Sequence, residues 1–437
     1  MRHDTWHNWA CTESASPYRY ATPGSVAELS ALVAAAAERG LRVKAVGAGH
    51  SFTGAAVTDG ILVSLDGLSG IDSVTLTPSG ALVRVLAGTR LRELSEQLWH
   101  RGLAMINLGD IDVQSIAGAV STGTHGTGMR FGGLASQIRA LQVVLADGSV
   151  TECSPTENPD LFEAARLGLG AVGILSAVTI ECVPHFVLHA AETPDSLTAT
   201  LERIDHDCAT TDHFEFYWFP HTRRVLTKRN TRLPGDTPTA PLHPVRALVE
   251  DELMANLVFE GINRVATLIP SAIPQLNGLA CRALGAREFT DRSHRVFASA
   301  RRVKFREMEY AIPLAALPDA LTAIEAWIHD SGFTVAFPVE VRFAAADSVW
   351  LSTAHGRDTA YIAVHQYHRR NHEPYFSAVE SILRAVDGRP HWGKMHGRTA
   401  DDLRPAYPHF DEFVSVRDKY DPARMFGNAY LQQVLGS

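Results

Sequence analysis

The first 184 residues carry apolar positions at two spacings, one typical of helices and one typical of short strands. Leu29 and Val33 recur at helical spacing between Ser25 and Gly40, and Glu28 stands three residues after Ser25. This arrangement predicts a helix that opens on a Ser25–Glu28 capping box and ends at Gly40.

A second helix and several strands are predicted in the same region. Thr89 is expected to cap a helix that has apolar residues at positions 91, 94 and 98 and ends at Gly102. The strand patterns cover residues 41–46, 61–71 and 81–88. Short strands mixed with helices, rather than long strand–helix–strand units, predict an α+β domain.

Strand patterns return in the second half of the chain, at residues 303–313, 333–343 and 360–368. Helix patterns near 314–330 and 373–387 separate them. Strands of this spacing, not each followed by a long crossover helix, predict a second α+β domain built on an antiparallel sheet.

The segment 249–284 is mostly apolar and is interrupted by Pro270 and Pro274. Two interpretations stay open. The first is a pair of helices that covers the second domain; the second is an exposed apolar surface for a membrane or a redox partner, which we rank lower. No uninterrupted apolar run of about 20 residues occurs, so no transmembrane helix is predicted.

Composition and charge narrow the classes of function. The chain has 437 residues and a formal net charge of −8 with acids and bases spread along it, which argues against a nucleic-acid binder. The five cysteines are widely spaced without a CxxC pair, and the N-terminal residues lack the basic and apolar regions of a signal peptide. We therefore expect reduced thiols and a cytoplasmic protein.

A glycine-rich turn, VGAGHSFTG (46–54), follows the strand pattern 41–46. Gly47 and Gly49 allow a tight turn and expose N–H groups that can cradle a pyrophosphate. The dinucleotide fingerprint is not satisfied, because Phe52 stands where its third glycine would fall and no amphipathic helix follows. By themselves, this turn and His50 are explained as well by a structural role.

Two further glycine-rich loops lie in the same domain, STGTHGTG (121–128) and GLGAVGIL (168–175). The first loop can bring amides and hydroxyls to phosphate oxygens from Thr122, Gly123, Thr124, Gly126 and Thr127. Three such loops beside apolar strand patterns predict an extended cofactor with a phosphate bridge.

Together with several other blocks, these loops resemble the FAD-linked oxidoreductases of the vanillyl-alcohol oxidase fold, and within them the aldonolactone oxidase branch. The resemblance covers nearly the whole chain. The blocks that carry it are WHNWA (6–10), GAGHS (47–51), the stretch 102–128, GLGAVGIL (168–175), EVRF (340–343), HWGK (391–394) and FVSVRDKYDPARMFGNAYL (413–431).

The resemblance implies an FAD-binding domain of the PCMH type with two small sheets over residues 1–184. A substrate and cap domain would follow over 185–410, and a C-terminal segment, 411–437, would pack back near the FAD domain. It also implies an extended FAD that is linked covalently through His50. The implied cofactor contacts are Gly47, Ala48, Gly49, His50, Ser51, Asp110, Ser115, Gly118, Thr122, Gly123, His125, Gly126, Thr127, Gly173 and Ile174.

Glu340 and Arg342 stand two residues apart on the strand pattern VEVRF, so their side chains share one face of the strand. An isolated pair of this kind is most often a surface salt bridge, but apolar residues on both flanks predict that this pair is partly buried. The resemblance places both residues beside the flavin. There Glu340 would bond substrate hydroxyls, and Arg342 would offset the negative charge of the reduced flavin.

The resemblance also implies an active-site lysine, Lys394 in HWGKMH, and an active-site histidine, His365. Beside Arg342, the pKa of Lys394 is expected to be depressed, so that Lys394 accepts the hydroxyl proton of the substrate; the alternative is a charged lysine that only orients the substrate. No metal is expected, because His365 and His368 would face opposite sides of a strand and no HExxH motif occurs.

These features predict FAD-dependent oxidation of a sugar-derived 1,4-lactone of the L-gulono-, L-galactono- or D-arabinono- type, by hydride transfer to flavin N5. Reoxidation would use O₂ or an electron-acceptor protein or quinone. An alditol such as xylitol is the nearest alternative substrate. Two other classes are weighed: a non-catalytic flavin or sugar carrier, which the charged trio Glu340, Arg342 and Lys394 disfavours, and a lactone hydrolase, for which no GxSxG motif is present.

Overall fold

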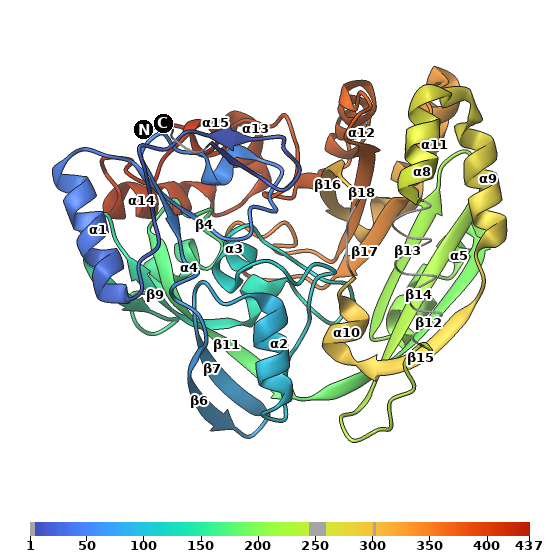
Figure 1. The fold of residues 1–437 in the computed structure, drawn as a ribbon. Coiled ribbons are helices and arrows are strands. Elements are labelled where there is room, and N and C mark those ends of the chain that lie inside the picture. The colour runs from blue at the N-terminus through green and yellow to red at the C-terminus, as the bar shows by residue number, and fades with distance from the viewer. Residues whose placement is uncertain (1–4, 244–258, 300–302) are drawn as a thin grey trace.

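The computed structural model describes residues 5–243, 259–299 and 303–437. Figure 1 shows two lobes side by side, with the N- and C-termini close together on one of them. The lobe that carries the termini contains the chain up to strand β11 (Ile174–Pro184) and the C-terminal helices, whereas the other lobe is built on one large sheet.

Two small sheets form the first lobe, as the resemblance implied. A parallel sheet has the order β3-β5-β4 (Arg19–Ala21, Ile61–Ser64, Val43–Val46). An antiparallel sheet has the order β10-β9-β11-β7-β6, with β8 also paired to β11. Its further strands are β6 Ile71–Thr77, β7 Gly80–Leu86, β8 Leu103–Met105, β9 Ile138–Val144 and β10 Val150–Cys153, and a short β1-β2 pair (Trp6–His7, Ser14–Ala15) lies near the N-terminus.

The single strand predicted over 61–71 is wrong. The structure divides this stretch between β5 in the parallel sheet and β6 in the antiparallel sheet. Between the two strands the chain turns, with the Leu68 N–H donating to the Leu65 carbonyl at 2.8 Å, and both leucines are buried. Spaced apolar residues therefore marked burial here, but they did not distinguish a strand from a turn with a buried side.

Helix α1 (Val26–Glu38) begins where the sequence predicted it. The Ser25 side chain accepts a hydrogen bond from the Glu28 N–H at 3.1 Å, and Gly40 follows the helix with a left-handed φ of 62°. The second half of the capping box differs from the prediction, because the Glu28 carboxylate accepts from the Gly24 N–H (2.8 Å).

The predicted cap of the second helix is wrong. Arg90 precedes helix α2 (Leu91–Trp99) and makes no side-chain cap. Thr89 instead donates its hydroxyl to the Leu86 carbonyl at 2.6 Å and accepts the Gly70 N–H at 2.9 Å. The bond from Gly70 ties the turn before the helix to the loop before β6, and the bond to Leu86 closes that turn. Because its hydroxyl is engaged in these bonds, Thr89 does not cap helix α2.

An antiparallel sheet of eight strands forms the second lobe and confirms the predicted sheet type. Its order is β15-β12-β14-β13-β17-β18-β16-β19. The predicted strand 333–343 is shorter in the structure and becomes β17 (Val339–Ala344). The other strands are β12 Phe186–Ser196, β13 His213–Phe219, β14 Arg224–Pro234, β15 Arg287–Arg292, β16 Phe305–Pro313, β18 Thr359–Tyr367 and β19 Arg389–Pro390.

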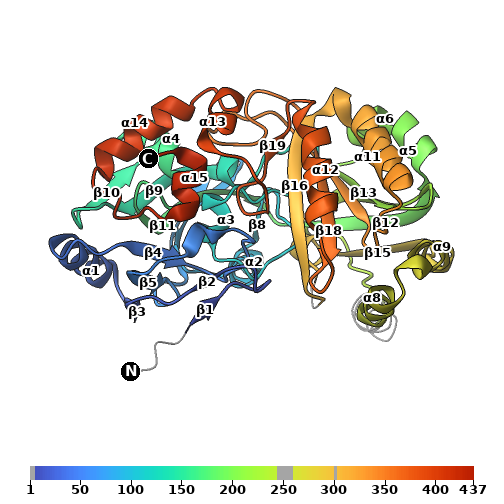
Figure 2. The same cartoon turned by 90° about the horizontal axis from the view of Figure 1, so that it is seen from above.

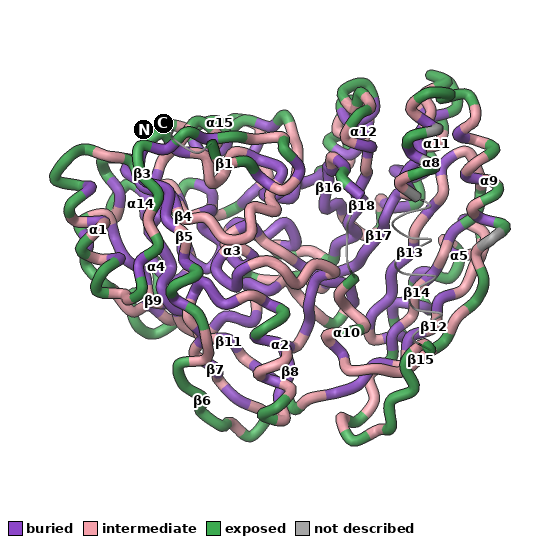
Figure 3. Tube along the Cα trace, in the orientation of Figure 1, coloured by how far each residue is buried: buried purple, intermediate pink, exposed green. Residues whose placement is uncertain are grey.

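Helices cover one face of this sheet. Helices α5 (Leu197–Glu202), α6 (Ile204–Thr210), α11 (Leu317–Ser331) and α12 (Glu373–Arg384) lie together along it in Figure 2. Their apolar side chains share a core with alternate sheet residues such as Met308, Val341 and Ile362. The strands β16, β17 and β18 lie next to the first lobe and are buried along most of their length in Figure 3.

The C-terminal helices return to the first lobe (Figure 2), which also contains α3 (Ile116–Ser121). There α14 (Phe410–Tyr420) packs against α4 (Pro159–Ala165), and α15 (Ala429–Leu435) packs against the short turn of helix at Gly54–Ala56. Phe413 and Val434 belong to the core of that lobe. Leu403 and Tyr407 belong to it as well, so the return begins upstream of residue 411, near the short helix α13 (Ala400–Leu403).

Within the apolar segment, the described residues form two helices, α8 (Phe259–Leu268) and α9 (Ile273–Ala283), with Pro270 and Pro274 at the turn between them. Leu268, Ile269 and Leu279 are exposed on them. The beginning of the predicted segment, 249–258, lies outside the described residues. Among the described helices, none combines the length and the apolar character that a membrane crossing requires.

Candidate active site

A cleft in the first lobe is lined mainly by small residues and backbone. It holds about 910 Å³ of empty space between the loop after β4 and the segments 114–122 and 169–175. A Cβ at Gly47 would lie 2.3 Å from Ser115 Oγ, and Gly49 has a left-handed φ of 67°. Both positions thus require glycine, which keeps the wall of the cleft at backbone level.

A second cavity, here called the chamber, continues from this cleft. The chamber has about 480 Å³ of empty space. His50, Ser51, Gln114 and Thr122 line both cavities, so His50 stands where they meet. A long, glycine-walled cleft that opens into a charged chamber fits the extended FAD that the resemblance implies, with its ring system toward the chamber.

Several polar and charged residues in and beside the chamber come from one face of the large sheet. On β16, β17 and β18, alternate residues point toward the helices, and those between them point toward the first lobe. In the register of the sheet, Ala363 on β18 lies opposite Glu340 on one side and Glu309 on the other. Residue 307 lies opposite His365 in the same way. Because side chains alternate between the two faces along each strand, Glu307, Glu309, Glu340 and His365 all project from the same face of the sheet.

Arg342 is buried and surrounded by carboxylates. It forms ion pairs with Glu340, with Glu215 (Nε to Oε2, 3.0 Å) and with Asp110 (Nη2 to Oδ2, 3.4 Å). Burial lowers the pKa of Arg342, but the three carboxylates outweigh this effect and hold the pKa well above its usual value. The predicted burial of the Glu340–Arg342 pair is confirmed. Arg342 is paired with three carboxylates, and its expected role toward the flavin stays a prediction.

Lys394 is held by a carboxylate that the sequence reasoning missed. Its Nζ lies 2.5 Å from Oε2 of Glu307. Burial lowers the pKa of Lys394, but the charges of Glu307 and Glu309 reverse this and raise the pKa above its usual value. The predicted depression of this pKa is therefore wrong, because a neighbouring carboxylate stabilises the ammonium more than burial penalises it. The structure favours the alternative, a charged lysine.

His365 lies on the other side of the same glutamate. Its Nε2 is 3.5 Å from Oε1 of Glu307, and its Nδ1 is 3.4 Å from the Pro338 carbonyl. The loop that carries Lys394 is tied to the same strand, since the Met395 N–H donates to the Glu307 carbonyl at 2.9 Å. Glu307 therefore joins the two predicted residues, Lys394 and His365, which are 29 positions apart in the sequence.

His50 is half-buried and stacks on Trp9, with ring centroids 5.3 Å apart. Burial lowers its pKa to about 4, assisted by the positive charges of Lys394, Arg90 and Arg92. The imidazole is therefore neutral at pH 7. A neutral ring nitrogen is the form that can bond to an electrophilic carbon.

The predicted cofactor contacts divide into two groups. Most line the cleft or the chamber: Gly47, Ala48, Gly49, His50, Ser51, Asp110, Ser115, Gly118, Thr122, His125, Gly173 and Ile174. Gly123, Gly126 and Thr127 line neither cavity. Thr127 instead joins the lobes, because its hydroxyl donates to the Phe214 carbonyl and accepts from the Phe343 N–H.

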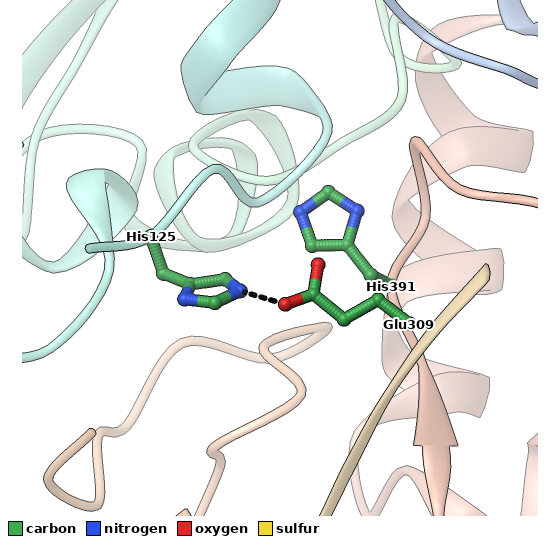
Figure 4. A group of neighbouring side chains, drawn as sticks. All are labelled: His125, Glu309 and His391. Atoms are coloured by element: carbon green, nitrogen blue, oxygen red, sulfur yellow. Dashed lines mark ion pairs between the residues drawn. The ribbon is translucent and has the colours of Figure 1, made fainter. Parts of the chain in front are cut away.

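Three buried side chains in the chamber could be taken for a metal site. Figure 4 shows His125, Glu309 and His391, whose ligand atoms lie within 4.8 Å of one another. His391 Nδ1, however, accepts a hydrogen bond from the Gly393 N–H at 3.0 Å, which leaves the ring proton on Nε2. With this tautomer His391 has no free lone pair for an ion, so the arrangement supports a hydrogen-bonded group better than a metal ligand set.

Sequence reasoning missed Glu215, Glu307 and Glu309. Glu215 and Glu309 each stand between apolar residues on a strand pattern, in HFEFYW and in FREMEY, whereas Glu307 stands between Arg306 and Met308. The signal used for Glu340 in VEVRF was therefore available for Glu215 and Glu309. What the sequence lacked was the order of the strands, which brings Glu309 to the wall of the chamber and brings Glu215 and Glu307 to Arg342 and Lys394, the two cations that line it.

Comparisons with known proteins agree with this geometry. The family profile for D-arabinono-1,4-lactone oxidase matches residues 178–434, and that for the FAD binding domain matches 17–154. The chain is 44% identical to an L-gulono-1,4-lactone dehydrogenase of Mycobacterium tuberculosis over 99% of both chains. It is 34% identical to an L-gulonolactone oxidase of Bos taurus over 98% of both.

The fold has a counterpart among solved structures. A cholesterol oxidase from B. sterolicum superposes with a TM-score of 0.78 at 19% identity, over 99% of this chain and 96% of the other. At that identity the likeness concerns the fold alone. The family profile, the full-length relatives and the cleft lead to the same conclusion: the chain belongs to the D-arabinono-1,4-lactone oxidase family and is an FAD-dependent oxidoreductase.

Proposed function

We propose that this protein oxidises a secondary hydroxyl of a sugar-derived 1,4-lactone, with FAD held covalently through His50. The observation that carries the proposal is the continuity of the glycine-walled cleft with the charged chamber at His50. Relatives named for L-gulono-1,4-lactone support the substrate class. When bound, FAD supplies the hydride acceptor.

The residues of the chamber have distinct tasks in this proposal. Arg342 and Lys394 are both charged, so they donate hydrogen bonds to oxygens of the lactone and hold it in one orientation. Glu340 accepts a hydrogen bond from a substrate hydroxyl, in competition with its bond to Arg342. His365 acts through Glu307 and positions Lys394.

The two lobes exclude bulk water from this reaction. Phe52 and Gly393 join the loop of His50 to the loop of Lys394, with the Phe52 N–H donating to the Gly393 carbonyl at 2.8 Å. In a chamber shielded in this way, ion pairs and hydrogen bonds to the substrate are stronger than in water. The unpaired cysteines support the proposal of a cytoplasmic protein.

An absorption spectrum of the purified protein tests this function. The protein is precipitated with acid and then, in a second sample, mixed anaerobically with L-gulono-, L-galactono- or D-arabinono-1,4-lactone, or with xylitol as the open-chain control. We expect flavin colour that stays with the pellet and bleaching by a lactone. Colour released by acid would contradict the bond to His50, and bleaching by xylitol alone would reassign the substrate to an alditol. The electron acceptor, O₂ or another, follows from reoxidising the bleached sample with each.

A further inference from the structure

Glu309 differs in its partners from the other acids in and beside the chamber. Glu340, Glu215 and Asp110 are paired with Arg342, and Glu307 is paired with Lys394. Glu309 lines the chamber, and among the described residues its one ion-pair partner is His125, with Oε1 3.2 Å from Nε2. Its other oxygen, Oε2, makes no hydrogen bond within that part of the chain.

His125 is held in a single orientation behind this carboxylate. Its Nδ1 lies 2.9 Å from the Gly126 carbonyl, so Nδ1 carries a proton and donates it there. The ring stacks on Tyr361, with centroids 3.6 Å apart and an interplanar angle of 16°. Nε2 then faces the Glu309 carboxylate, as Figure 4 shows, and the contact is a hydrogen bond only when a proton lies between the two atoms.

The other ionisable groups of the chamber are poor proton acceptors. Lys394 is held as an ammonium by Glu307. His391 receives the Gly393 N–H on Nδ1, so its second nitrogen already carries the ring proton. The carboxylate of Glu340 is engaged by Arg342. The pair of His125 and Glu309, by contrast, lines the chamber and still has an atom that can accept a proton.

We propose that Glu309 and His125 together accept the hydroxyl proton of the substrate. This inference rests on the proposed function. The O–H bond of the substrate breaks, and its proton passes to Oε2 of Glu309 and then, as the carboxyl turns, to Nε2 of His125. The hydrogen on the carbon leaves with its electron pair to the FAD, and the carbon becomes a carbonyl. Each proton and electron pair is thereby accounted for.

The charge on Glu309 suits this relay. Burial raises its pKa, but a protonated His125, together with His391 and Lys394, outweighs burial and brings the pKa below its ordinary value. Once the proton has reached His125, Glu309 is therefore ionised again beside an imidazolium. It passes the proton on rather than keeping it, and His125 is the final acceptor.

The test is anaerobic reduction of the bound flavin by the lactone, followed over a pH series. Glu309→Gln is expected to reduce about 10²–10⁴-fold more slowly than wild type, the usual contribution of a general base, with flavin content unchanged. Added formate should restore part of the rate in Glu309→Ala. In the wild type the rate should rise with pH, because a proton acceptor works only in its unprotonated form, and His125→Gln should lack this rise.

Glu192→Gln is the matched control. Glu192 is a buried glutamate of the same sheet, paired with Arg287 at 2.8 Å, and it does not line the chamber. Its substitution should leave the reduction rate and the pH dependence at wild-type values. Wild-type reduction by Glu309→Gln, or a persisting rise with pH in His125→Gln, would overturn the proposal. If no lactone bleaches the wild type, it is the proposed function that fails, which separates the two results.

Discussion

The cleft and the chamber are adjacent cavities built from different materials. Of the 24 residues that line the cleft, two are ionisable, Lys44 and His50. Of the 14 that line the chamber, seven are ionisable. The cleft is therefore lined mainly by backbone groups, hydroxyls and small side chains. The chamber is lined by charged side chains that ion pairs hold in position.

This difference separates binding from chemistry. Backbone groups at glycine positions can approach an extended cofactor closely, and they need no proton to do so. Buried charges are costly to desolvate, so they persist only when each is paired, as Arg342 is with three carboxylates and Lys394 with Glu307. The fixed arrangement of charges in the chamber therefore lowers the stability of the fold, and the cleft requires no such arrangement.

The largest effect is expected from Arg342→Met. The substitution leaves the buried Glu215 and Glu340 and the half-buried Asp110 without their common cation, which should cost about 3–5 kcal/mol of unfolding free energy and at least about 10²-fold in the rate of flavin reduction. Thermal unfolding and anaerobic stopped-flow measure the two effects. Arg342→Lys keeps a charge and should recover most of the stability. Equal stability of the Met variant and the wild type would show that the chamber is not held by this ion-pair network.

Lys394→Met comes next. A missing donor to the substrate should slow reduction about 10²–10³-fold. Because the pKa of Lys394 is raised, the lysine stays charged until the pH passes above its usual range. The stability from its pair with Glu307 is thus fully present at neutral pH and is lost only as the pH rises through the raised value. The pH dependence of reduction around neutrality should persist in Lys394→Met. Its disappearance would restore the lysine as the proton acceptor.

Gly47→Ala tests the cleft without touching the chamber. The new Cβ would lie 2.3 Å from Ser115 Oγ, which caps helix α3 by accepting the Gly118 N–H at 3.3 Å. We expect the affinity of the apoprotein for FAD to fall about tenfold, equivalent to about 1.4 kcal/mol. The fraction that binds FAD should reduce at the wild-type rate. Gly278→Ala, where a Cβ meets nothing within 4 Å, is the control.

The last prediction concerns Lys44, the ionisable residue of the cleft other than His50. Burial lowers the pKa of Lys44 to about 7, against a smaller opposite effect of Asp421. Between about 7 and the usual 10.5 the unfolded chain binds this proton and the folded chain does not, so the unfolding free energy rises with pH, by at most about 1.4 kcal/mol per unit. Denaturant unfolding of the apoprotein should show a difference between wild type and Lys44→Met that changes in this window. A constant difference would contradict the lowered pKa.

The sequence predicted the cleft better than the chamber for a physical reason. Each wall of the cleft is a short continuous motif, such as GAGHS, whose glycines report the local backbone. The chamber is lined by Glu309 from β16 and Arg342 from β17, and its cations are held by Glu215 from β13 and Glu307 from β16. Their mutual positions depend on strand order and register, which no local pattern contains.

The error over Lys394 has the same origin. The depressed pKa was expected from the nearness of Arg342, but the sign of the pKa shift depended on Glu307, 87 residues earlier in the chain. The strand 61–71 and the Thr89 cap failed for a different reason, because the turn after β5 and the loop before β6 use those residues in contacts between segments. Fold class and the main elements were predictable from spacing alone.

The most direct test of the division between cleft and chamber measures two quantities in the same pair of variants. Flavin affinity of the apoprotein and anaerobic reduction rate by the lactone are determined for Gly47→Ala and for Glu309→Gln. The account predicts a crossed result, with affinity lowered only in Gly47→Ala and rate lowered only in Glu309→Gln. If both quantities fall together in both variants, binding and chemistry are not separated between the two cavities, and the account is contradicted.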